Sequence, residues 1–216
     1  MATPAVSRAA QVPALIPLSL LEAIRNLDTP VEDGLAEVAE EVVAKRLGLS
    51  QTVAAQIARY RGAAERRELV PDDEAVGVFR LVARRPDRDL VFADAGRRAA
   101  RHASRLAGRT SEALRRATPA GLSRRLGARS ALGLATRVFG LEPLPTPGTG
   151  EPATRATDTP ALAAAPDGGA CAYYSAALGE LLRGLAAFEG AVDHPRCRGR
   201  GDAACEWHAS AARGYE

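Results

Sequence analysis

Residues 171–185 read CAYYSAALGELLRGL, and residues 194–207 read HPRCRGRGDAACEW. The first segment places apolar residues at helical spacing, which predicts an amphipathic helix. Residues 188–197 and 204–210 are typical of two strands, and a glycine-bearing turn at 198–202 separates them. We therefore predict a helix followed by a β-hairpin at this end of the chain.

This helix and hairpin contain all three cysteines of the chain and a histidine, in the order Cys171, His194, Cys197 and Cys205. An odd number of clustered cysteines argues against a disulfide framework. Since His194 and Cys197 would point to opposite faces of a straight strand, we expect a bend or bulge at Pro195. Three thiolates and an imidazole form a complete tetrahedral ligand set for zinc, of the closed structural kind without a catalytic water.

Other interpretations of these residues stay open at this point. His208 is a rival ligand, but it lies three residues from Cys205 and would face the other side of a strand. Asp193 is suited to be either an oxygen ligand or the acceptor that fixes a histidine tautomer. The simplest alternative is that the cysteines pack as small hydrophobic residues without a metal.

The pattern of apolar residues predicts helices over the first two thirds of the chain. Apolar residues recur at helical spacing after Pro17, from 35 to 49, from the N-cap candidate Ser50 to Tyr60, and after Pro71. An alanine- and arginine-rich helix follows over 94–108, with two more helical pieces before about 138. Between Gly140 and Gly169 lie six of the 14 prolines and no sustained helical period. Taken alone, this stretch fits either a linker or short edge strands with turns.

Composition and charge narrow the functional classes. Hydrophobic residues make up 46% of the 216, enough for a packed core, and the formal net charge is +3. Aromatic residues make up only 4%, too few for a surface that stacks bases, and no helix-turn-helix is evident, so nucleic-acid binding is not expected. Residues 12–21 are interrupted by Pro13 and Pro17 and are too short to span a membrane; we expect a cytoplasmic protein.

Positive charge is concentrated between Arg97 and Arg137, where eleven arginines accompany a single acid, Glu112. Such a segment attracts carboxylates, phosphates, an anionic membrane surface or an acidic partner enzyme. The alternative is a solvated helical face whose arginine content follows genome composition.

The C-terminal part of the chain resembles the end of the 4-vinyl-reductase domain family, from Cys171 through FEGAV at 188–192 to Trp207. That family ends in a helix, a strand, a Cys, a Gly-Asp turn and a second Cys. In related phenol-sensing activators, a Cys, a Glu and two Cys bind structural zinc at matching spacing, and His194 stands where those have the Glu. Upstream, DAGRRAA at 94–100 is similar to the divinyl chlorophyllide 8-vinyl reductase type of the bacteriochlorophyll pathway.

The resemblance implies an α+β fold, commonly dimeric, with helices packed on a small antiparallel sheet. It places strands between Gly140 and Gly169. We therefore expect a single domain over 1–216, mainly helical over about 10–138, with strands, a helix and the zinc-stapled hairpin over 139–210. The expected assembly is a homodimer.

A vinyl reductase needs a source of hydride or electrons, and the sequence offers none. The one dinucleotide-like string, GRGDAA at 199–204, lies inside the hairpin and not between a strand and a helix. The resemblance therefore implies a protein that binds or delivers a hydrophobic tetrapyrrole of the chlorophyllide type, and whether it is an enzyme stays open. The alternatives are a stand-alone sensor of aromatic hydrocarbons that acts through a partner, and a helical adaptor without a ligand.

His102 is a further candidate, for cofactor binding. It shares a helical stripe with Ala95, Ala99 and Leu106, a face of small side chains that would admit a flat ligand. On this hypothesis it is an axial ligand to magnesium or iron in a tetrapyrrole. The alternative is a half-buried helix histidine with a hydrogen-bond partner.

Overall fold

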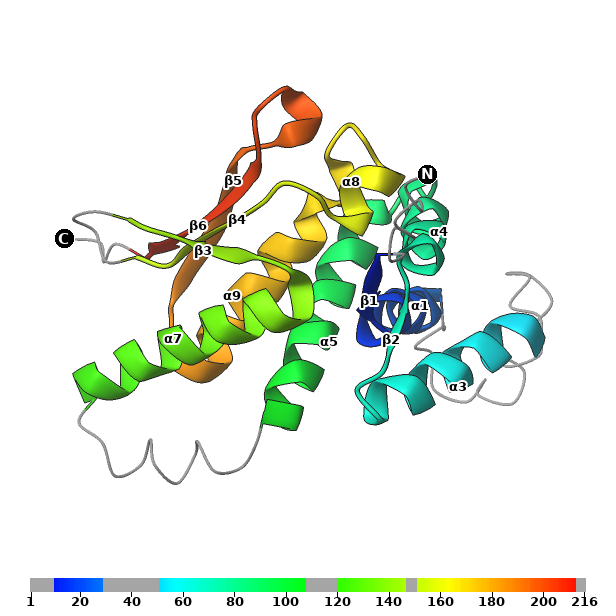
Figure 1. The fold of residues 1–216 in the computed structure, drawn as a ribbon, viewed down its shortest axis with the longest axis horizontal. Helices are drawn as coiled ribbons and strands as arrows, with labels where there is room; N and C mark the ends of the chain where they lie inside the picture. Colours follow the sequence, from blue (N-terminus) through cyan, green and yellow to red (C-terminus); the bar gives the residue numbers. More distant parts are fainter. Residues whose placement is uncertain (1–9, 29–50, 108–119, 147–150, 213–216) are drawn as a thin grey trace, which may run out of the picture.

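The computed structural model describes residues 10–28, 51–107, 120–146 and 151–212, and Figure 1 shows helices packed beside an antiparallel sheet. The described helices are α1 (Leu15–Asp28), α3 (Gln51–Glu65), α4 (Asp72–Ala83), α5 (Arg88–Ala107), α7 (Ala120–Phe139), α8 (Pro160–Ala164) and α9 (Ala172–Ala186), with 3-10 turns η1 (Gly169–Cys171) and η2 (Arg198–Arg200). The predicted α+β fold is confirmed.

The main sheet has four antiparallel strands in the order β3-β4-β6-β5. These are β3 (Glu142–Leu144), β4 (Ala153–Ala156), β5 (Gly190–Arg196) and β6 (Cys205–Ala211). A separate pair, β1 (Gln11–Pro13) and β2 (Leu69–Pro71), joins the start of α1 to the start of α4. The hairpin predicted from the C-terminal sequence is therefore β5 and β6, and the helix before it is α9.

The described residues between 140 and 169 include two strands of the sheet, β3 and β4, and the short helix α8, so the linker interpretation is wrong for them. β4 pairs with β3 on one side and with β6 on the other, which makes it an interior strand. Thr159 begins α8 by accepting the backbone N–H of Leu162 at 3.2 Å. The strands that the family resemblance implied are present.

The helices expected in the first two thirds are confirmed where the structure describes the chain. α1 begins at Leu15, before Pro17, because a proline in the first helical turn lacks only an N–H that would have no helical partner. The segment 35–49, the N-cap candidate Ser50 and residues 108–119 lie outside the described residues. No described helix has the length and hydrophobicity needed to cross a bilayer.

Helix α9 lies at the centre of the packing, flanked by α5 and α7 and covered by β5 and β6 (Figure 1). Its buried face includes Tyr173, Tyr174 and Leu178, all fully buried. Small residues let the neighbouring helices approach closely. A Cβ added to Gly96 of α5 would lie 2.1 Å from the Tyr173 carbonyl oxygen, and one added to Gly127 of α7 would lie 1.9 Å from the Leu185 carbonyl oxygen.

This close approach predicts a large loss of stability for Gly96→Ala, because the added methyl group forces α5 and α9 apart. Overpacking of this kind costs about 1–3 kcal/mol of unfolding free energy, more than the gain from helix propensity. Chemical denaturation followed by circular dichroism measures it.

Gly77→Ala in α4 is the matched control, since an added Cβ there meets nothing within 4 Å. It should raise the unfolding free energy by up to about 1 kcal/mol. Equal effects of the two substitutions would contradict the close α5–α9 contact.

Candidate metal centre

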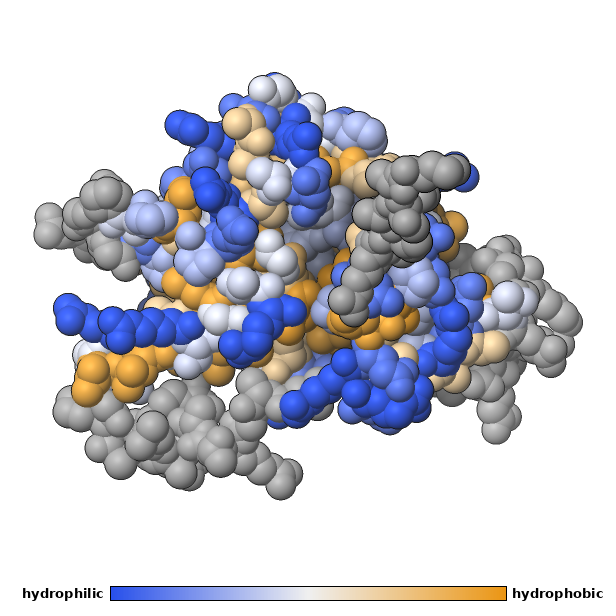
Figure 2. Space-filling view, viewed as in Figure 1, coloured by the Kyte–Doolittle hydropathy of each residue, from blue (hydrophilic) through white to orange (hydrophobic). Residues whose placement is uncertain are grey.

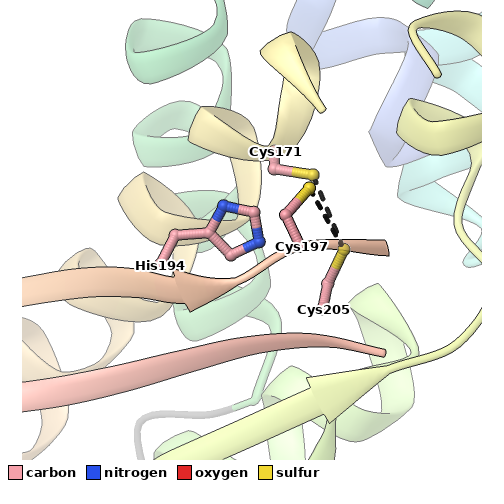
Figure 3. Close-up of side chains that lie close together, drawn as sticks. All are labelled: Cys171, His194, Cys197 and Cys205. Atoms are coloured by element: carbon pink, nitrogen blue, oxygen red, sulfur yellow. Dashed lines mark hydrogen bonds between the residues drawn. The ribbon is translucent and has the colours of Figure 1, made fainter. Parts of the chain in front are cut away.

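Four side chains from three separate segments converge at one end of α9 (Figure 3). Cys171 ends η1 and directly precedes α9, His194 lies in β5, Cys197 follows β5, and Cys205 begins β6. One potential ligand atom from each of the four lies within 4.8 Å of the others. All the residues predicted as metal ligands are thus brought together, close enough to bind one metal ion.

The distances between the sulfur atoms match those of a mononuclear tetrahedral site. The Sγ atoms of Cys171 and Cys205 are 3.9 Å apart, as are those of Cys205 and Cys197. A disulfide would bring two sulfurs to about 2.05 Å, and all three cysteines are free. Metal–sulfur bonds of about 2.3 Å at tetrahedral angles place sulfurs about 3.8 Å apart.

A β-bulge in β5 turns His194 and Cys197 toward the same point. Asp193 pairs with His208 and Arg196 with Glu206, so β5 advances three residues while β6 advances two. The extra residue reverses the alternation of side chains along the strand. The bulge expected at Pro195 is therefore confirmed.

His194 is held against Trp207, the fully buried aromatic residue of β6. The two rings stack with their centroids 5.0 Å apart and their planes within 11°. The imidazole projects toward the three sulfur atoms (Figure 3), and its Nε2 atom is buried without a hydrogen-bond partner. An unsatisfied buried nitrogen costs about 1–3 kcal/mol, a cost that a metal ion at this point would remove.

Burial also sets the protonation of the donors. It lowers the pKa of His194, so the imidazole is neutral at pH 7 and offers a lone pair. Burial and the neighbouring thiols raise the pKa values of Cys171 and Cys205. In the metal-free protein these two thiols are therefore protonated, and a metal ion must displace their protons.

The turn between the hairpin strands supports the cluster through its backbone. The backbone N–H of Arg198 donates to Sγ of Cys205 at 3.4 Å, which partly offsets the effect of burial on the pKa of that thiol. The Asp202 carboxylate accepts the backbone N–H of Cys197 at 2.7 Å. The Arg198 guanidinium donates to the Thr157 carbonyl oxygen at 2.6 Å, which ties the turn to the segment after β4.

Gly168, in the turn before Cys171, lies directly against the sulfur atom of Cys197. Its φ of +79° lies in the left-handed region, and an added Cβ would lie 2.4 Å from Sγ of Cys197. The turn before Cys171 can approach the cluster only because this position is glycine. Neither Gly168 nor Trp207 was identified from the sequence, although Trp207 shares the core-facing side of β6 with Cys205.

The rival residues lie elsewhere. His208 is on the opposite face of β6 from Cys205, with its Nε2 atom 3.3 Å from Glu206. Asp193 is exposed and accepts a hydrogen bond from Ser210 at 3.4 Å. Neither belongs to the group of four that could hold a metal ion.

The environment of His102 differs from the expected small-residue face. Ala95 and Ala99 are fully buried in the helical core and offer no open surface to a flat ligand. His102 is half-buried at a cavity lined mainly by charged and polar side chains of α1, α5 and α9. Its Nε2 atom is buried and makes no hydrogen bond within the described chain.

The arginine-rich segment is divided between two helices. Arg97, Arg98, Arg101 and Arg105 lie in α5, and a second group lies in α7. Figure 2 shows hydrophilic and hydrophobic residues side by side on the visible face of this part of the molecule. The remaining arginines, at 109, 115 and 116, fall outside the described residues.

No family model matches the chain, and comparisons with curated proteins and with solved structures find no match. The resemblance to the 4-vinyl-reductase domain therefore remains a prediction from residues 94–100 and 171–207.

The protonation states predict that metal affinity depends steeply on pH. Metal binding displaces at least the protons of Cys171 and Cys205, so the logarithm of the association constant should rise with pH with a slope of about 2 or more. Competition with a chromophoric chelator between about pH 6 and pH 8 measures this slope.

Two variants assign the pH dependence to the cluster. Cys197→Ser should lose the bound metal, whereas His208→Ala, on the other face of β6, should keep it with an unchanged slope. A slope near zero, or metal loss in His208→Ala alone, would contradict the assigned site.

Proposed function

We propose that the protein is a ligand-binding domain of the 4-vinyl-reductase type whose C-terminal hairpin is fixed to α9 by a structural zinc ion. The observation that carries this proposal is the closed set of Cys171, His194, Cys197 and Cys205, with sulfur–sulfur distances of 3.9 Å. The four donors satisfy a tetrahedral ion completely, and a site of this kind stabilises structure.

The donor types favour zinc over other metals. Thiolates and a neutral imidazole suit zinc, whereas magnesium and calcium prefer oxygen ligands. Three cysteines are one short of the usual ligands of an iron–sulfur cluster. When bound, zinc would supply a cross-link between the start of α9 and the hairpin, and it contributes no redox chemistry.

We further propose that the ligand is a chlorophyllide-type tetrapyrrole, which the protein holds or delivers for a partner enzyme. Support for this ligand comes from the residues shared with the 4-vinyl-reductase family. A site with four protein donors leaves no position for a catalytic water, which favours a binding role over catalysis at the metal. The positive charge of the arginine-rich segment suits a ligand or partner that carries carboxylates.

Titration of the metal-loaded protein with chlorophyllide tests this function against the sensor alternative. We expect a saturable change in pigment absorbance at about one ligand per chain, and no displacement by excess phenol. Bovine serum albumin at the same concentration controls for non-specific adsorption of the pigment.

Two results would overturn the proposal. One is chlorophyllide binding no stronger than that of the albumin control. The other is saturable binding of phenol that displaces the pigment or excludes it, which would favour the aromatic-hydrocarbon sensor.

A further inference from the structure

Apart from the candidate metal centre, the structure has a cavity among the helices, between α1, α5 and α9. Its volume is about 580 Å³, within the range of about 300–1,000 Å³ that small-molecule sites occupy. Figure 1 shows α5 between α1 and α9, which both pack against it. Glu180 and Gly184 line the cavity from the second half of α9. At a rise of 1.5 Å per residue, they lie more than about 13 Å from Cys171 along the axis of α9. The cavity is therefore separate from the four candidate metal ligands.

One face of α5 lines this cavity with positive charge. Arg98, Arg101, His102 and Arg105 all border the cavity, within two turns of the helix. Arg98 is neutralised by Asp94 of the same helix, with Nε and Oδ2 2.6 Å apart. Arg101 has a looser ion pair, with its Nε atom 3.6 Å from Glu180, and Arg105 has no carboxylate within 4.0 Å among the described residues.

Each of the two acids that line the cavity accepts a hydrogen bond from an arginine outside it. Glu22 of α1 accepts from Arg61 of α3 at 2.6 Å. Glu180 of α9 accepts from Arg183 at 2.8 Å. The closest partner of each acid is thus an arginine outside the cavity, so among the described residues Arg101 and Arg105 leave the cavity with excess positive charge.

Within the described chain, neither of these guanidinium groups donates a hydrogen bond through its Nη atoms. Arg101 donates through Nε to the Arg97 carbonyl oxygen at 3.3 Å, and its Nε atom is 3.6 Å from Glu180, beyond hydrogen-bond distance. Arg105 donates through Nε to the Arg101 carbonyl oxygen at 3.3 Å and lies within 4.0 Å of no carboxylate among the described residues. A guanidinium with free Nη donors suits the two oxygens of a carboxylate or phosphate.

His102 adds a polar atom that lacks a partner. Its Nε2 atom is buried and makes no hydrogen bond within the described chain. Burial, with a smaller effect from Arg105, lowers the pKa of His102, so the imidazole is neutral at pH 7. A neutral imidazole can accept or donate a hydrogen bond, and a ligand in the cavity would supply its partner.

We propose that this cavity binds a small molecule through an oxyanion, a carboxylate or a phosphate, held by Arg101 and Arg105, with Nε2 of His102 bonding a polar atom of the same ligand. The inference deepens the proposed ligand-binding function and rests on it. For a chlorophyllide, the group held would be the free carboxylate. The role of His102 is then a hydrogen bond to the ligand, in place of axial coordination of its metal.

The test compares chlorophyllide with its methyl ester, which lacks the free carboxylate. The proteins are the metal-loaded wild type, the double variant Arg101→Gln/Arg105→Gln and the control Arg97→Gln. Arg97 belongs to the same helix but lines a different cavity, between α5, α9 and β5. Metal content and circular dichroism verify that each variant is folded.

We expect the wild type and Arg97→Gln to bind the acid about tenfold more tightly than the ester, because a charge-assisted pair is lost with the ester. In the double variant the two dissociation constants should become nearly equal, and inorganic phosphate should compete with the acid only in the other two proteins. Equal binding of acid and ester by the wild type would overturn the inference while leaving the pigment-binding function intact. If the double variant still bound the acid about tenfold more tightly than the ester, the inference would likewise be overturned and the pigment-binding function would stand.

A different outcome separates the two proposals. If neither pigment binds, the proposed function fails, and the cavity is tested with inorganic phosphate alone. NMR shifts of the His102 ring on phosphate addition, absent in the double variant, would support the oxyanion site for another ligand. No shift in the wild type would overturn it.

Discussion

The convergence of three buried thiols and one half-buried imidazole is the constraint on which the C-terminal half of the structure depends. Cys171 and Cys205 are separated by most of the last quarter of the chain, yet their sulfur atoms lie 3.9 Å apart. Without a cation the group is poorly satisfied, because the Nε2 atom of His194 has no partner and the thiols are weak hydrogen-bond donors. A metal ion held by these four residues would cross-link the start of α9 to both ends of the hairpin turn. The bulge in β5, the stacking of His194 on Trp207 and the glycine at 168 all serve this convergence.

Helix α9 connects the metal cluster to the rest of the protein. Its first turn follows Cys171, its middle packs on α5 and α7, and its second half borders the cavity at Glu180. A hydrogen bond of 3.1 Å between Tyr173 and Ser19 links the metal end of α9 to the cavity lining of α1. Burial raises the pKa of the Tyr173 hydroxyl, so this bond involves a neutral phenol at physiological pH. Fixing the start of α9 therefore also fixes one wall of the cavity. On the proposed function, a metal without redox chemistry would contribute to ligand binding by ordering the helix that borders the proposed ligand site.

Local sequence patterns were sufficient for α9, for the hairpin and for the four donor residues. The odd spacing of His194 and Cys197, with Pro195 between them, also predicted a bend or bulge, because a straight strand would send their side chains to opposite faces. Contacts between distant segments were not predictable in this way. The pairing of β4 with β6 joins residues about fifty positions apart, and the four-residue β4 is too short for a strand pattern. The cavity is assembled from Ser19, His102 and Glu180, and their proximity depends on how three helices pack. The small-residue stripe on α5 was interpreted as a ligand surface, but Ala95 and Ala99 of that stripe are fully buried in the helical core.

X-ray absorption spectroscopy at the zinc edge of the purified protein tests the central claim most directly, because it reports the atoms bound to the metal. We predict a four-coordinate ion with three sulfur neighbours at about 2.3 Å and one nitrogen at about 2.0–2.1 Å, at one ion per chain. A first shell of oxygen atoms, fewer than three sulfurs, or the absence of stoichiometric zinc would contradict the account.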